Sequence, residues 1–82
     1  MDRSYFFRYD IIGVNTNKKA KEVISLLTEV DGVFNVTMNN KFKLIYIEMK
    51  NIKNVKELNA VIQPKYKLEN GLNMELFTRF FP

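Results

Sequence analysis

The sequence predicts an α+β fold, a ferredoxin-like sandwich in which two helices cover one face of an antiparallel sheet. Two segments have the three- and four-residue apolar spacing of amphipathic helices, and stretches with strand character lie before, between and after them. The resulting order is β-α-β-β-α-β. Two right-handed βαβ halves of this kind place the strands in the sheet order 4-1-3-2. We expect this sheet to be followed by an extra C-terminal strand or tail.

The first half of the chain contains a strand, a helix and a second strand. Aromatic and β-branched residues alternate over residues 4–12, and Gly13 ends that run. Asp31-Gly32 suits a helix C-terminus, and residues 33–39 have the pattern of the second strand. The helix is predicted over residues 18–30, where the apolar residues recur at helical spacing: Ala20, Val23, Ile24, Leu27 and Val30.

The second half predicts a hairpin, a short helix and two further strands. A tight turn at Asn39-Asn40 leads into a third strand over residues 41–49. Asn54, followed by a glutamate three residues later, resembles a capping box, and Pro64 ends the helix that it starts. A short fourth strand follows at residues 65–69. Asn70-Gly71 then predicts a hairpin turn into a fifth strand.

Composition limits the size of the domain and the chemistry that it can hold. A chain of 82 residues, 46% of them hydrophobic, suffices for one small core. We predict a single domain over residues 1–82, with its core at 4–69 and a hairpin or tail at 70–82. The chain has no cysteine and no histidine, which removes the ligands that Cu(I) and Zn(II) prefer and the usual neutral-pH proton carrier. We expect no cofactor and no metal.

The loop and helix after the first strand resemble the heavy-metal-associated (HMA) domain of copper chaperones and metal-pumping ATPases. The pattern of that family runs Gly-Met-x-Cys-x-x-Cys, followed by spaced apolar residues and a Gly-Val that opens the next strand. Residues 13–19 here are Gly-Val-Asn-Thr-Asn-Lys-Lys. The resemblance covers roughly residues 5–69 and implies the ferredoxin-like fold; its other matching positions are Val23, Leu27, Gly32, Val33, Leu58, Ile62 and Tyr66.

The two metal-binding positions of that family hold Thr16 and Lys19 here, and Val14 replaces the methionine. A hydroxyl is a poor ligand for Cu(I), and an ammonium repels cations. We interpret the chain as a diverged member of the family that lacks its Cys-x-x-Cys motif. The metal function that the resemblance implies is therefore not expected at these positions.

The same loop is a candidate site for a small anion. Free amides at a helix N-terminus bind phosphate and carboxylate groups. The alternative is a solvated first turn that binds nothing, which the lack of a glycine-rich phosphate loop favours. A diverged metal or small-anion carrier acting through residues 13–19 is the second functional hypothesis, and its candidate residues are Asn15, Thr16, Asn17, Lys18 and Lys19.

The face of the sheet opposite the helices is predicted to be apolar. The first and third strands are neighbours in this topology, and an apolar patch that they share is usually covered. We consider three covers: the aromatic C-terminal tail, a second copy or another protein, and RNA bases, which RNA-recognition motifs stack on the same two strands. The residues predicted to share this face are Phe6, Ile12, Phe42, Leu44 and Tyr46.

We predict a non-catalytic module for protein interaction or homo-oligomerisation, with a homodimer as one form. Nucleic acid is not the expected partner, because residues 41–44 lack the glycines of the RNA-binding consensus. The interface candidates are Phe6, Phe42, Leu44, Tyr46, Phe77, Phe80 and Phe81.

Two further patterns concern catalysis and localisation. Asp10 and Glu48 are predicted on one strand face, but no nucleophile accompanies this carboxylate pair, so we expect no enzyme and no catalytic residue. No segment is apolar over a membrane-spanning length. Arg8 and Asp10 also interrupt the apolar run that a signal peptide needs, so we expect a cytoplasmic protein.

Overall fold

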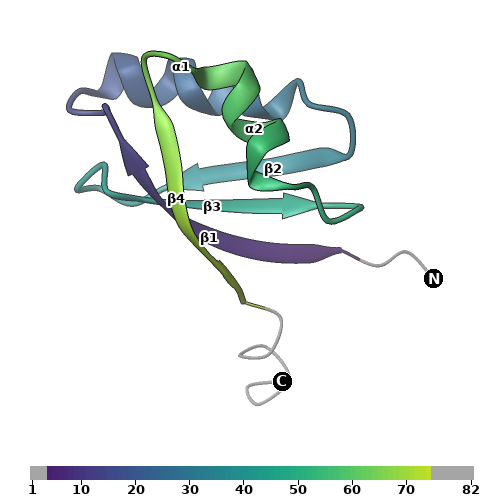
Figure 1. The fold of residues 1–82 in the computed structure, drawn as a ribbon. Coiled ribbons are helices and arrows are strands. Elements are labelled where there is room, and N and C mark those ends of the chain that lie inside the picture. The colour runs from purple at the N-terminus through teal and green to yellow at the C-terminus, as the bar shows by residue number, and fades with distance from the viewer. Residues whose placement is uncertain (1–3, 75–82) are drawn as a thin grey trace.

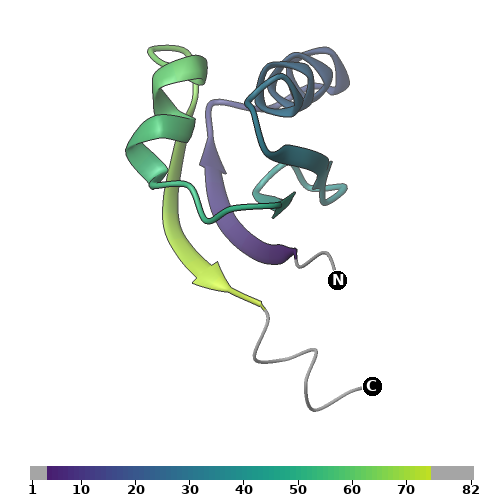
Figure 2. The same cartoon turned by 90° about the vertical axis from the view of Figure 1, so that its right-hand side faces the viewer.

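A computed structural model of the chain describes residues 4–74 (Figure 1). The elements follow in the order β1 (Tyr5–Ile12), α1 (Asn17–Thr28), β2 (Val33–Met38), β3 (Leu44–Met49), α2 (Val55–Ile62) and β4 (Lys67–Asn73). The strands form one antiparallel sheet in the order β2-β3-β1-β4. Figures 1 and 2 show both helices on the same side of this sheet. The predicted ferredoxin-like fold and its strand order are confirmed.

The hydrophobic core lies between the two helices and the inner face of the sheet. Every second residue of β3 points into it, while α1 and α2 each contribute one apolar stripe. Fully burying a side chain of this size stabilises the fold by about 1.5–3 kcal/mol. The largest fully buried side chains are Val23, Leu27, Ile45, Ile47, Met49, Leu58 and Leu68.

The two helices begin at residues whose side chains accept backbone amides. The Thr16 hydroxyl accepts a hydrogen bond from the Lys19 amide at 3.2 Å, and the Asn54 side chain accepts one from the Lys56 amide at 2.9 Å. Both are N-caps, which satisfy amides that the helix itself leaves free. α1 therefore begins at Asn17, one residue before the predicted start. Within residues 4–74 no helix is long and apolar enough to cross a membrane.

The connection between β2 and β3 differs from the predicted tight turn. The Asn39 side-chain oxygen accepts the amides of Lys43 and Leu44, each at 3.0 Å, which stabilises a longer loop. Phe42 lies in that loop with a positive φ of 58°. The third strand consequently starts at Leu44 and not at residue 41, and Phe42 is not a strand residue.

The predicted hairpin at Asn70-Gly71 is wrong, because β4 runs through these residues. Arg8 pairs with Leu72 and Asp10 with Glu69, so Asn70 and Gly71 together lie opposite the single residue Tyr9 as a β-bulge.

The geometry of the bulge explains why an asparagine and a glycine occupy positions 70 and 71. Asn70 adopts a positive φ of 53° and donates from Nδ2 to Oδ2 of Asp10 at 2.7 Å. A Cβ at Gly71 would lie only 2.7 Å from Cε1 of Tyr9. The glycine therefore allows the close approach of β4 to the Tyr9 ring. The rest of the predicted tail, residues 75–82, lies outside the described residues.

Candidate interaction face and the residue 13–19 loop

The outer face is the side of the sheet opposite the helices, and it carries apolar residues from three strands. They alternate with residues that point into the core, such as Tyr9, Ile11 and Ile45. Phe6, Ile12 and Leu72 are 38%, 48% and 37% exposed, so large apolar side chains face solvent here. The apolar residues of the outer face are Phe6, Ile12, Leu44, Tyr46 and Leu72.

Strand register places charged residues between these apolar ones. Arg8 lies opposite Tyr46 on β3 and opposite Leu72 on β4. The strands of this face carry two basic residues, Arg8 and Lys67. They also carry three acidic residues: Asp10, Glu48 and Glu69. Such a face lacks the positive excess that attracts a phosphate backbone, so it does not resemble an RNA-binding sheet.

An exposed phenylalanine extends the apolar surface beyond β1 and β3. The register of β2 shifts between Val33 and Asn35, which leaves Phe34 in an irregular position. Phe34 is 52% exposed and lines a hollow of about 730 Å³ together with Ser4, Glu48 and Lys50. This hollow lies at the end of the sheet where β1 begins, and Glu48, one of its lining residues, pairs with Phe6.

The structure brings together only some of the predicted interface residues. Phe6, Leu44 and Tyr46 share the outer face as expected. Phe42 is not a strand residue of this face; it lies in the loop before β3 and lines a hollow of about 620 Å³ that reaches Ile12 at the end of β1. Phe77, Phe80 and Phe81 lie outside the described residues.

Sequence reasoning missed two apolar residues near this face, Leu72 and Phe34. Leu72 reaches the outer face because β4 continues past its bulge and pairs with β1. Phe34 is exposed where the register of β2 shifts. Strand irregularities depend on the partner strand, so no local pattern could have indicated either position.

The predicted carboxylate pair does not form. Asp10 lies opposite Leu44, whereas Glu48 lies opposite Phe6, and the pair of Arg8 with Tyr46 stands between them. Asp10 accepts the hydrogen bond from Asn70 in the β4 bulge. Both carboxylates therefore belong to the outer face as separate charges.

The residues of the 13–19 loop do not gather in one site. Thr16 is the N-cap of α1 and its hydroxyl already accepts the Lys19 amide. Asn17 is the first, exposed residue of α1, and Asn15 lines the hollow beside Phe42. Of the five candidate residues, Lys18 and Lys19 line a third hollow, of about 480 Å³, whose other lining residues are Gly13, Glu22, Lys65 and Tyr66.

This lysine hollow is built on a close contact between two loops. A Cβ at Gly13, where φ is +104°, would lie 2.5 Å from the backbone oxygen of Lys65. Nζ of Lys65 lies 3.6 Å from Oε1 of Glu22, and the Tyr66 hydroxyl donates to the same oxygen at 2.9 Å. No local pattern predicted that Glu22 would contact Lys65 and Tyr66, because it is over 40 residues from both along the chain.

Burial, the hydrogen bond to Glu22 and the negative charge of Glu22 raise the pKa of the Tyr66 hydroxyl above its ordinary value. The phenol therefore stays protonated at neutral pH and donates to the carboxylate. The Glu22 charge partly offsets the three lysines around the hollow. An anion bound there would have to face this carboxylate.

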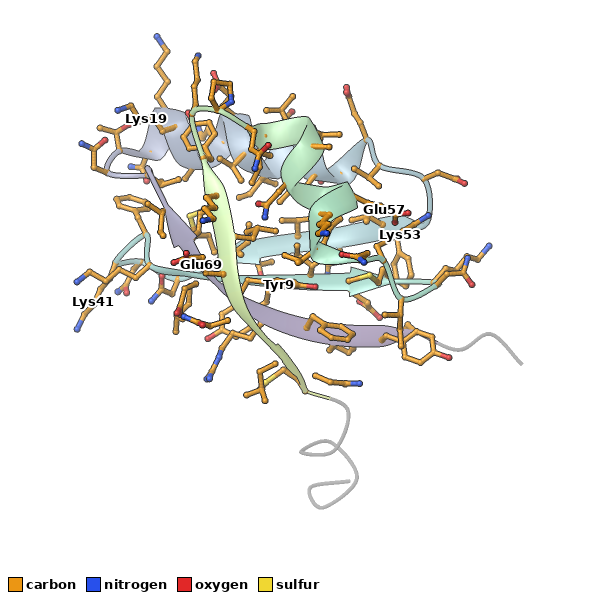
Figure 3. The ribbon with its side chains drawn as sticks, in the orientation of Figure 1. Tyr9, Lys19, Lys41, Lys53, Glu57 and Glu69 are labelled. Atoms are coloured by element: carbon orange, nitrogen blue, oxygen red, sulfur yellow. The ribbon has the colours of Figure 1, made fainter. Side chains whose placement is uncertain are left out.

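The residues present do not fit a soft metal ion. Among residues 4–74 no group of three or more histidine, cysteine, aspartate or glutamate side chains is arranged to hold a metal. At the two positions that bind metal in HMA domains, the Thr16 hydroxyl is occupied as a helix cap and Lys19 carries a positive charge. Figure 3 shows Lys19 at the beginning of α1, in the helix layer.

Comparison with known proteins gives one likeness of fold. Neither the models of known protein families nor the curated protein sequences match this chain. Among solved structures, the chain is similar to one described as "CsoZ metallochaperone", with a TM-score of 0.68 and 14% sequence identity. The likeness covers 83% of this chain and 100% of the other. At this identity the comparison shows a likeness of fold alone.

Proposed function

We propose that the chain is a non-catalytic docking domain, a diverged HMA relative, that binds a second copy of itself through its outer face. The observation that carries this proposal is the exposure of Phe6, Ile12 and Leu72 on a side of the sheet that neither helix covers. Tyr46 and Leu44 on β3 lie in register between Phe6 and Ile12 on this face. Apolar surface of this kind marks interaction sites in soluble proteins.

The charges of the outer face suit contact with an identical surface. In a two-fold symmetric contact, each copy presents the same residues to the other. Arg8 and Glu48 form no ion pair with another side chain of residues 4–74. Arg8 of one copy can therefore pair with Glu48 of the other, while the apolar residues beside them are buried.

The net charge of +4 does not oppose such a contact strongly. The lysines of the helices, such as Lys19 and Lys56, belong to the layer on the other side of the sheet. Repulsion between solvated charges is largely screened beyond a Debye length of about 8 Å at physiological salt. Association through the outer face keeps these lysines away from the contact.

Sedimentation velocity of the full chain over a concentration series tests the proposal. We expect a dimer, and we expect Phe6→Glu to weaken it by about 100-fold, because a charge is buried where an aromatic ring packed. Val61→Glu is the matched control, since Val61 is 41% exposed on α2 and lies in the helix layer. A full chain that stays monomeric to about 1 mM would contradict the proposal.

A diverged metal or small-anion carrier acting through the residue 13–19 loop is the second candidate function. Lys18, Lys19 and Lys65 line one hollow beside the start of α1, and the protein of similar fold is described as a metallochaperone. Titration with inorganic phosphate, followed by amide chemical shifts, should then move residues 13–19 and Lys65 together, and Lys65→Gln should weaken the binding. Lys56→Gln on α2 is the control. Movement with Zn(II) or Cu(I) instead of phosphate would indicate a metal carrier.

A further inference from the structure

β4 is held in different ways on the two sides of its bulge. Before the bulge, Leu68 is fully buried; its amide donates to Oδ1 of Asn59 at 2.7 Å, and its carbonyl accepts from Nδ2 of Asn59 at 3.2 Å. After the bulge, residues 71–74 are exposed or half-buried, and pairing with β1 holds them. Local opening at the bulge would therefore free residues 71–74 and leave the core intact.

The bulge itself requires a chemically reactive pair of residues. Its first position has a positive φ, which asparagine tolerates better than most residues. Its second position allows no side chain, because a Cβ at Gly71 would overlap the ring of Tyr9. When glycine follows asparagine, its backbone nitrogen can attack the asparagine carboxamide with the least steric hindrance. Among the asparagines of the chain, only Asn70 precedes a glycine.

The reaction is an intramolecular attack followed by hydrolysis. The backbone nitrogen of Gly71 loses its proton and bonds to Cγ of Asn70, and Nδ2 leaves as ammonia, which gives a cyclic succinimide. Water then opens the ring at either of its two carbonyl carbons. One product is an aspartyl residue at position 70, and the other is its β-linked isomer, whose backbone is longer. Each product has a carboxylate in place of a neutral amide, and solvent water is the only co-reactant.

The structure exposes Asn70 to water but restrains its side chain. Asn70 and Gly71 are both exposed, and they lie outside the paired positions of β1 and β4. Nδ2 of Asn70 donates to Oδ2 of Asp10 at 2.7 Å, which restricts the carboxamide to one orientation. Attack on Cγ competes with this hydrogen bond. Asp10 therefore slows the reaction while β4 is intact.

The new carboxylate would lie at a corner of the sheet that is already acidic. Asp10 lies opposite Glu69, whose carboxylate is 3.4 Å from Nζ of Lys67. With a carboxylate at position 70, the hydrogen bond to Asp10 becomes a repulsion between two anions. Like charges that face each other across strands weaken the pairing. The longer backbone of the β-linked isomer also displaces the bulge.

We infer that Asn70 is a site of spontaneous deamidation, and that its conversion releases residues 71–74 from β1. Leu72 then leaves the outer face, so the modification weakens the dimer as the protein ages. This consequence for the dimer rests on the proposed function, whereas the reaction and the release of β4 do not.

Peptide mass spectrometry of the aged full chain tests the reaction. Trypsin releases residues 68–79 as one peptide, within which fragmentation locates the mass gain of deamidation. We expect the gain at Asn70 during prolonged incubation at neutral pH. Asn73 of the same peptide is the internal control, because the Met74 side chain hinders the corresponding attack. Asp10→Ala should speed the modification of Asn70 by about tenfold, since a hydrogen bond to a charged group is lost.

Three full-length variants test the release of β4. Asn70→Asp reproduces the aspartyl product and should raise the hydrogen-exchange rate of the Met74 amide, which donates to the Phe6 carbonyl, by about tenfold. Asp10→Asn/Asn70→Asp exchanges the carboxylate and the amide, so it restores a donor opposite an acceptor and should return the rate to that of the unaltered chain. Asn35→Asp is the control, because β2 is separated from β4 by two strands.

Exchange is measured at concentrations at which sedimentation shows a monomer, so that dimerisation does not protect the amides. Circular dichroism checks that each variant is folded. At higher concentration, Asn70→Asp should weaken the dimer by about tenfold, and the exchanged pair should restore it.

Each contrary result removes a defined part of the inference. If Asn70 deamidates no faster than Asn73, position 70 is not a modification site, and the proposed function is untouched. If Asn70→Asp leaves the exchange rate of the Met74 amide unchanged, or the exchanged pair does not restore it, repulsion between carboxylates does not release β4. If the unaltered chain is monomeric, the consequence for the dimer falls with the proposed function, while deamidation and release are decided by their own measurements.

Discussion

The residue 13–19 loop and the outer face of the sheet differ in what defines them. The backbone conformation defines the loop, and the arrangement of side chains defines the outer face. The loop has a defined backbone: Gly13 adopts a positive φ, and Thr16 caps α1. Its side chains, however, do not converge on one ligand. The outer face has no special backbone at its centre, yet its side chains form an apolar surface with balanced charges. The loop is therefore defined by its backbone, whereas the outer face is defined by the side chains that strand pairing places on it.

The largest effect should come from Gly13→Ala, which tests whether the loop is mainly structural. The new Cβ would lie 2.5 Å from the Lys65 backbone oxygen and would force an L-residue to φ +104°. We expect the free energy of unfolding, measured in urea, to fall by about 3 kcal/mol.

Gly32→Ala is the matched control for that change. Gly32 also has a positive φ, +87°, but a Cβ there would meet only the flexible Lys53 side chain, at 3.6 Å. A loss of about 1 kcal/mol is expected. Equal losses at both glycines would show that the contact between Gly13 and Lys65 does not tighten the loop.

Leu72→Glu tests whether the outer face is the dimer interface. Leu72 is partly exposed beside Arg8, so its replacement leaves the monomer intact but puts a charge into the proposed interface. We expect the dimer measured by sedimentation to weaken by about 30-fold, while the unfolding free energy of the monomer changes by less than about 0.5 kcal/mol. Lys19→Glu, in the loop region, should leave the dimer unchanged.

Thr16→Ala should separate helix capping from ligand binding. Losing the hydrogen bond from the Lys19 amide to the Thr16 hydroxyl should lower the unfolding free energy by about 1 kcal/mol. Thr28→Ala is the control, because its hydroxyl only donates back to the Ile24 carbonyl within α1, and its loss should cost less than about 0.5 kcal/mol. If dimer affinity also fell in Thr16→Ala, the loop would belong to the interface.

The smallest effect concerns alkaline pH and the Tyr66 hydroxyl beneath the lysine hollow. Its pKa is raised in the folded chain above the ordinary value of about 10. Its contribution to stability is thus complete below about pH 10 and is lost as pH rises through the folded-state pKa. Urea unfolding between pH 8 and pH 11 should show this decline, and Tyr66→Phe should make it shallower.

Part of that decline should persist in Tyr66→Phe. Burial also raises the pKa of the Tyr9 hydroxyl, which acts in the same direction. Removing both hydroxyls in Tyr9→Phe/Tyr66→Phe should flatten the dependence further. An unaltered slope in the double variant would assign the alkaline decline to other groups.

Several parts of the fold could be predicted because they depend on neighbouring residues alone. The apolar stripe of α1 follows from spacing within one helix, and Asn54 caps α2 through a contact two residues away. Period-two alternation placed Phe6 and Tyr46 on the outer face. Each of these features is decided within a turn or two of chain.

Other parts could not be predicted because distant residues decide them. A positive φ, which Asn70 adopts, occurs both in hairpin turns and in β-bulges, so the local sequence Asn70-Gly71 is compatible with either. The pairing of β4 with β1 on both sides of Tyr9 selects the bulge. The lysine hollow likewise exists only because the connection between α2 and β4 brings Lys65 beside Gly13.

The sequence by itself determined the type and order of the elements, the absence of cysteine and histidine, and the apolar character of alternate strand residues. Only the tertiary structure decided that β4 continues to Asn73, that Leu72 joins the outer face, and that the Met74 amide donates to the backbone oxygen of Phe6. The physical reason is that local preference fixes which conformations a segment can adopt, whereas hydrogen bonding to a partner strand selects among them. The docking surface proposed for this protein is a product of that selection.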